Sequence, residues 1–171
     1  MSTDTCATSP LPLEQATNLL LIIDAETLLT RYSQPSLDPQ RPTMIEDGFI
    51  FSAGASSSGH ELIIPLSGAL HLRGRTVGLH AEHSVVLYNL TVGDTGVLEP
   101  PQLVVHSQLP LPAPNPEIPT EPLTGKANDH YWRCRPLSPG VERCELGFML
   151  VDSNCEVLGY FGWEVEVTVS G

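Results

Sequence analysis

The closing residues of the chain carry the pattern that most constrains its fold. In residues 163–169, WEVEVTV, every second residue is apolar and the residues between them are glutamate or threonine. Because successive side chains of a β-strand point to opposite faces of the sheet, this alternation predicts a strand with one buried face and one face in water. Such a strand needs a sheet to join and a core to cover.

Shorter runs with a period near two fill most of the chain after residue 47. Glycine, serine and proline separate these runs at intervals of roughly ten to fifteen residues, a spacing typical of antiparallel sandwiches and barrels. We therefore predict an all-β fold, an antiparallel β-sandwich with one short helical turn after the first strand. The runs cover residues 48–53, 61–66, 69–73, 84–91 and 102–107.

The first element is predicted from a continuous apolar run. Residues 18–23, NLLLII, indicate a buried strand, and Asp24 ends it in a position that can cap a following helix. Leu28, Leu29 and Tyr32 then fall at helical spacing before a series of prolines stops any regular element. A ligand contact for Asp24 is the alternative to this capping role.

The chain length fits one domain, since 171 residues can bury a sizeable core. Residues 1–17 are polar and lack a hydrophobic period, so we expect a flexible N-terminal arm there. We expect residues 18–171 to form a single β-sandwich domain.

Proline recurs through residues 100–122. Each proline removes a backbone donor and favours extended geometry in the residue before it. We expect a long surface loop at about 108–122. A proline-rich ligand for the aromatic groove of a partner is the alternative interpretation.

Two turns are expected near the end of the chain. Residues 138–140, SPG, suggest a hairpin that sets Cys134 opposite Cys144, with pairings shifted by one step as alternatives. Residues 152–155, DSNC, suggest a second turn that leads into the last strand.

The charge of the chain excludes some partners. Aspartate and glutamate number 20 against 8 lysines and arginines, which gives a net charge of -12. Such a surface repels phosphate backbones and anionic lipids, so we expect neither nucleic acid nor membrane as a partner. The N-terminal residues resemble no secretion signal and the cysteine spacing fits reduced thiols, so we expect a cytoplasmic protein.

No pattern of catalytic, cofactor-binding or metal-ligating residues is found. The histidines show neither an HxH pair nor an HExxH helix, and no GxSxG motif is present. Cys134 and Cys144 fit small core residues better than a reactive pair. We therefore predict no enzyme, no metal and no cofactor. The histidines considered are His60, His71, His80, His83, His106 and His130.

Three aromatic residues near the end of the chain raise a question of burial. Tyr160, Phe161 and Trp163 lie on a run with alternating faces, so they cannot all enter one core. Either a loop covers the remainder, for instance the turn at Leu28, Leu29 and Tyr32, or they form an apolar patch for self-association or for a planar ligand such as a sugar.

Both ends of the domain carry short motifs that occur together, in this order, in one known family. The closing motifs are Tyr131-Trp132, the strand from Phe148 to Asp152 and the tail from Gly159 to Trp163. The opening positions are Ile23, Asp24, Leu28, Leu29, Tyr32, Pro35, Ser36, Asp38, Pro42 and Thr43. In these motifs the chain resembles the bacterial inclusion-body protein family that includes PixA and AidA. Gly162, in place of a second aromatic, and Glu164-Val165, in place of Asp-Pro, depart from the family pattern.

This resemblance implies a function that the residues alone do not show. It implies a non-enzymatic, cytoplasmic protein that is often abundant or induced at high cell density, with no catalytic residues to carry over. We expect a self-associating protein, a homo-oligomer of at least two copies, linked to storage or stress. A small-molecule or carbohydrate-binding β-sandwich module is the alternative.

Overall fold

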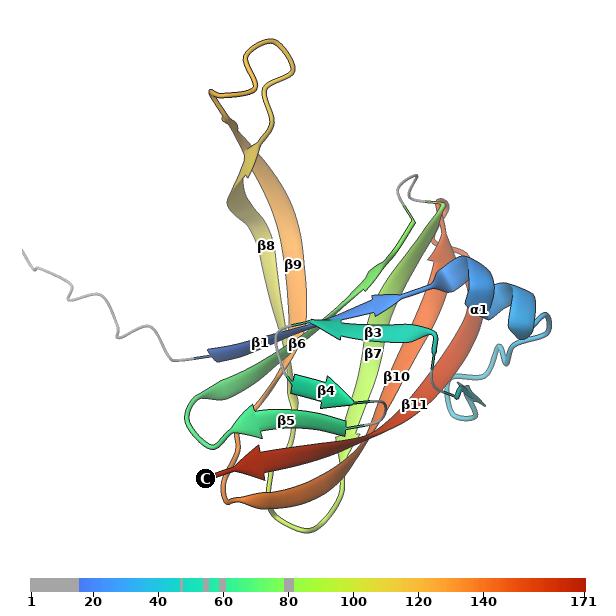
Figure 1. Cartoon of the computed structure of the whole chain (residues 1–171). Helices are drawn as coiled ribbons and strands as arrows, with labels where there is room; N and C mark the ends of the chain where they lie inside the picture. Colours follow the sequence, from blue (N-terminus) through green and yellow to red (C-terminus); the bar gives the residue numbers. More distant parts are fainter. Residues whose placement is uncertain (1–15, 47, 54–55, 59–60, 79–81) are drawn as a thin grey trace, which may run out of the picture.

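The computed structural model describes residues 16–46, 48–53, 56–58, 61–78 and 82–171. Its strands form two sheets that face each other across one core (Figure 1). The first, sheet A, has five strands in the order β3 (Ile50–Ala53), β1 (Ala16–Ile23), β6 (Ala69–Thr76), β9 (Leu123–Cys134) and β8 (Gln102–Ala113).

The second sheet, sheet B, contains the alternating closing strand at its centre. A short strand, β2 (Thr43–Met44), pairs beside β11 outside the main order. The main order is β4 (Ser56–Ser58), β5 (Glu61–Pro65), β11 (Val157–Ser170), β10 (Gly140–Asp152) and β7 (His83–Val92).

The predicted all-β sandwich with one short helix is confirmed. The pairing is mixed, however, because β1 runs parallel to β6, and β11 runs parallel to both β5 and β2. Parallel neighbours need long connections. The chain between β1 and β6 supplies one, since it contains the helix and four short strands.

The helix α1 (Ala25–Arg31) begins where the capping prediction placed it. The Asp24 carboxylate accepts a hydrogen bond from the Thr27 amide at 3.1 Å, so Asp24 is the N-cap. Leu28 is fully buried, and Leu29 and Tyr32 pack against the core. The helix therefore covers one end of the sandwich.

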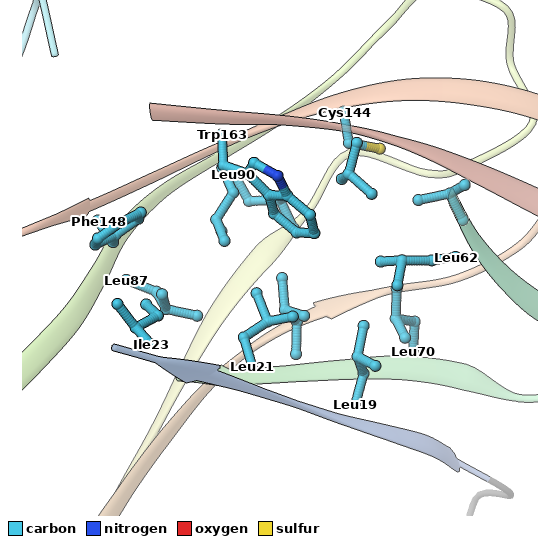
Figure 2. Packing of buried hydrophobic residues seen from close by; sticks show 14 of the residues in the cluster. Leu19, Leu21, Ile23, Leu62, Leu70, Leu87, Leu90, Cys144, Phe148 and Trp163 are labelled. Atoms are coloured by element: carbon cyan, nitrogen blue, oxygen red, sulfur yellow. The ribbon is translucent and has the colours of Figure 1, made fainter. Parts of the chain in front are cut away.

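The core lies between the inward faces of the two sheets. Leu19, Leu21 and Ile23 alternate on β1 and are buried, because every second residue of this strand faces sheet B. Figure 2 shows these side chains facing Phe148 and Trp163 of sheet B. The expected wet face of β11 is also confirmed, since Glu164 and Glu166 are exposed.

The prediction of a hairpin around residues 138–140 is wrong. β9 pairs with β6 and β8 in sheet A, whereas β10 pairs with β7 and β11 in sheet B. Residues 135–139 therefore carry the chain from one sheet to the other. Cys134 and Cys144 are both buried, but on different sheets, and they line a common part of the core. Alternation identified their inward faces but not their strand partners.

The second predicted turn is present between β10 and β11. The Asp152 carboxylate accepts hydrogen bonds from the amides of Asn154 and Glu156 at 2.8 and 2.9 Å. Hydrogen bonding to those amides, the Glu156 amide first, lowers the pKa of Asp152. Cys155 adopts a left-handed φ of 63° that closes the turn.

The proline-rich loop expected at about 108–122 is corrected in part. Strand β8 continues to Ala113 and pairs with β9 through Ala113 opposite Leu123, so only residues 114–122 connect the two strands. A register shift with Gln108 at φ 55° separates this outer part from the part inside sheet A. Prolines fit here because β8 is an edge strand, with one side of its backbone unpaired.

The predicted N-terminal arm lies almost entirely outside the described residues. The first strand begins at Ala16, two residues before the predicted start.

Candidate functional site

The three closing aromatics do not form a surface patch. Phe161 is fully buried and Trp163 is 3% exposed, because both share the inward face of β11. Tyr160 points the other way and packs edge-on against Tyr88, with ring centroids 5.3 Å apart. The structure therefore contradicts the possible self-association or ligand patch at Tyr160, Phe161 and Trp163.

The turn after α1 supplies the cover that was the alternative to this patch. The ring of Phe161 stacks on Phe148 with centroids 5.4 Å apart and meets the edge of Tyr32 at 6.3 Å. Beside β11, the Tyr160 amide donates to the Ser36 carbonyl at 2.8 Å, in an antiparallel bridge. The segment after the helix thus lies across this end of sheet B.

The described histidines do not converge on a metal site. His71 and His106 lie on either side of Tyr131, with centroid distances of 4.4 and 5.8 Å. In the part of the chain that the structure describes, no group of three or more His, Cys, Asp or Glu side chains could hold a metal ion. His60 and His80 lie outside that part.

A cationic and aromatic cluster on the outer face of sheet A was not predicted. Arg73 binds the Asp129 carboxylate through Nε and Nη2, the latter at 2.9 Å, and its guanidinium lies 4.4 Å from the Tyr131 ring centroid. Its Nη1 also donates to Asn18 at 3.0 Å. The alternation in residues 69–75, ALHLRGR, is the signal that places His71, Arg73 and Arg75 on one face.

The charges of this cluster largely satisfy one another. Partial burial acts to raise the pKa of Asp129, but the hydrogen bonds and charge of Arg73, together with the charge of Arg75, outweigh it and lower the pKa. With its donors directed to Asp129 and Asn18, Arg73 braces β6 against β9 and β1. The cluster therefore has a structural role in sheet A.

A buried carboxylate occupies the end of the sandwich near the thiols. Glu142 is fully buried, and its Oε2 accepts a hydrogen bond from the Thr95 hydroxyl. Its Oε1 has no hydrogen-bond partner among the described residues, and a Cβ on Gly93 would approach that oxygen to 2.5 Å. Burial raises the pKa of both Cys134 and Cys144 to about 12, so both stay protonated at neutral pH.

The outer face of sheet B is hollowed in two adjoining places. One hollow of about 530 Å³ lies over β7, β10 and β11 between Thr91, Arg143 and Glu166. The other, of about 420 Å³, is bounded by Tyr88 and Gln40, and Glu145 lines both hollows. Partial burial, and then the negative charge of Glu145, raise the pKa of Tyr88. This surface is polar, open and acidic.

The outer part of the β8–β9 pair carries exposed apolar side chains. We call residues 109–127 the projecting hairpin, because Figure 1 shows them extending away from both sheets. Leu111 and Leu123 are 47% and 50% exposed there. Residues 100–116 contain no charged side chain, in a chain with a net charge of -12. An exposed apolar segment without charge is typical of a surface that another molecule covers.

The fold defines the class of the protein as a two-layer β-sandwich that carries a projecting hairpin. The profile of the family described as PixA, inclusion body protein, matches residues 15–169. The chain belongs to this inclusion body protein family.

A solved structure shows the same fold. The inclusion body protein PixA from Burkholderia cenocepacia J2315 is similar with a TM-score of 0.76 at 22% sequence identity, over 92% of this chain and 97% of that chain. No curated protein sequence matches the chain. Within the described residues, no helix is long and apolar enough to cross a membrane.

Proposed function

We propose that this chain is a non-enzymatic cytoplasmic protein whose copies associate with one another, in an assembly that serves storage or a response to stress. The family supports the proposal, since its description is inclusion body protein. A protein that collects in inclusions must make contacts between copies. The description of the family names inclusion bodies and no reaction, which supports leaving a catalytic role out of the proposal.

One observation carries this proposal, namely an exposed apolar segment without charge, residues 100–116, that leads into the projecting hairpin of an acidic molecule. Copies with a net charge of -12 repel one another, so contact between them is least costly where charge is absent. The β8 strand of the projecting hairpin offers such a place, with Leu111 exposed on it and Leu123 exposed opposite Ala113. The same net charge opposes binding to nucleic acid or to an anionic membrane.

Sedimentation velocity of the full chain across the micromolar range tests the proposal. We expect the sedimentation coefficient to rise with protein concentration, and to do so equally with and without a chelator. A chain that stays monomeric across that range contradicts self-association. A chain that dissociates when the chelator is added contradicts association without metal.

A second candidate function rests on the hollow beside Tyr88. Its lining combines an aromatic ring with amide and carboxylate groups from Asn89, Gln40 and Glu145, a combination suited to a polyhydroxylated ligand such as a sugar. Calorimetric titration with a panel of sugars tests it. Binding that is lost in Tyr88→Ala and kept in Thr91→Val would support this function, and no heat with any sugar would set it aside.

A further inference from the structure

The projecting hairpin has two chemically different faces. In an antiparallel pair, directly opposed residues share a face, and alternate residues along a strand return to it. Pro110 is opposite Lys126, and Pro112 is opposite Thr124, which makes one face polar or proline-rich. The other face pairs Leu109 with Ala127, Leu111 with Gly125 and Ala113 with Leu123. This second face, the apolar face, is built entirely from apolar residues.

The free edge of the projecting hairpin cannot readily accept another strand. Opposed pairs in an antiparallel ladder alternate between hydrogen-bonded and unbonded. Because proline has no amide hydrogen, Pro110 and Pro112 fit positions whose amide would point away from β9. The outer edge of β8 therefore lacks donors at both positions, which opposes edge-to-edge pairing. Association through this element must use a face.

We propose that the apolar face is the contact surface between two copies of this chain, each laying its apolar face on that of the other. This inference rests on the proposed self-association and names its surface. Each rung of the face sets a leucine beside a small residue, so that a leucine of one copy can sit over a small residue of the other. A surface that pairs with itself is the kind that a two-fold dimer uses.

The charge distribution favours a second copy as the occupant. The apolar face has no charged residue, and β8 itself carries none, since Glu99 precedes it and Glu117 follows it; Lys126 of β9 lies on the opposite face. Two acidic molecules can therefore meet here with less repulsion than at the outer face of sheet B, where Glu145 is directly opposite Glu164. An isolated two-stranded hairpin is at best marginally stable in water, so pairing would also stabilise this element.

A matched pair of charge substitutions tests the inference. Leu111→Glu places a carboxylate on the apolar face, and Thr124→Glu places the same charge on the opposite face one rung away. Both positions are exposed, so neither substitution disturbs the core, and circular dichroism verifies that each variant is folded. Sedimentation equilibrium then gives the dissociation constant of each variant and of the wild type.

We expect Leu111→Glu to weaken association by at least tenfold, or about 1.4 kcal/mol, and Thr124→Glu to change it less than threefold. If the wild type associates and Leu111→Glu associates equally well, or if both variants weaken it equally, the apolar face is not the contact while self-association stands. A wild type that stays monomeric overturns both the proposed self-association and the proposed contact surface, and leaves another protein as the candidate that covers the apolar face.

A second measurement needs no variant. Hydrogen–deuterium exchange of the wild type at low and high protein concentration should show that amides of residues 109–127 exchange more slowly at high concentration. Protection that is equal at both concentrations, in a chain that sediments as an oligomer, places the contact elsewhere.

Discussion

At the scale of single residues, the buried polar groups near one end of the sandwich affect thiol reactivity and the free energy of unfolding. Glu142 depends on one hydroxyl group for its hydrogen bond, and the thiols of Cys134 and Cys144 are protonated because they are buried. By contrast, Cys155 lies exposed in the β10–β11 turn. Cysteines of identical chemistry should therefore behave differently according to position.

Thiol labelling should show that difference. At neutral pH, iodoacetamide should modify Cys155 in the folded protein and leave Cys134 and Cys144 unmodified, since only an accessible thiolate reacts. Peptide mass spectrometry identifies each site, and labelling in urea is the control in which Cys134 and Cys144 react as well. Modification of Cys144 at the rate of Cys155 in the folded protein would contradict the burial described here.

The same thiols predict a loss of stability at alkaline pH. Folding raises their pKa from 9.0 to about 12, so the unfolded thiols ionise first. Their contribution to the free energy of unfolding is complete below about pH 9 and is lost as the pH rises from 9 toward 12. Urea unfolding at increasing pH should show this fall, and a Cys134→Ala, Cys144→Ala double variant should show a shallower one. If the free energy of unfolding falls with pH equally steeply in the two proteins, the buried thiols are not the cause of the fall.

Removing the hydroxyl group beside Glu142 should be costly. Thr95→Val leaves the buried carboxylate without its donor, and we expect the free energy of unfolding to fall by about 1–3 kcal/mol. Thr91→Val, on the outer face of β7, is the matched control and should change the free energy of unfolding by less than about 0.5 kcal/mol. Equal effects in urea unfolding would show that the Thr95 hydroxyl is not what satisfies Glu142.

At the scale of elements, local patterns predicted the strands better than their partners. Alternation located β11, and the turn residues at 152–155 located its hairpin with β10, because both signals act over a few residues. The pairing of Cys134 with Cys144 failed because alternation gives a face and not a neighbour. For Phe161 the sequence left a covering loop and a surface patch as alternatives, and the contact with Tyr32 shows that the turn after α1 is the cover.

The projecting hairpin shows the same limit for the candidate site. Its prolines indicated a loop, yet β8 extends through Pro110 and Pro112 because an edge strand tolerates missing donors. The apolar face combines residues from two strands joined by residues 114–122. It therefore appears only once the register between those strands is known.

Shortening the projecting hairpin should separate folding from association. Replacing residues 110–126 with an Asn-Gly turn removes no residue of the core, so we expect the melting temperature to stay within a few degrees. Association should be lost. A control that replaces only residues 115–121 keeps Leu111 and Leu123 and should still associate. Unfolding of the first variant would show that the hairpin is integral to the sandwich.

At the scale of the whole molecule, the proposed self-association would depend on two opposing properties. The net charge of -12 opposes contact between copies, while burial of the exposed apolar face of the projecting hairpin would favour it. Salt screens the repulsion between charges and leaves the burial of apolar surface largely unaffected. The ionic strength of the solution should therefore control the balance between monomer and assembly.

The most direct test of self-association is the weight-average mass of the full chain, measured by light scattering at constant protein concentration over increasing sodium chloride. We predict that the mass exceeds that of the 18.5 kDa monomer and rises with salt, because screening removes the repulsion that opposes apolar contact. A mass that remains that of the monomer at every salt concentration, or one that falls as salt is added, would contradict the account.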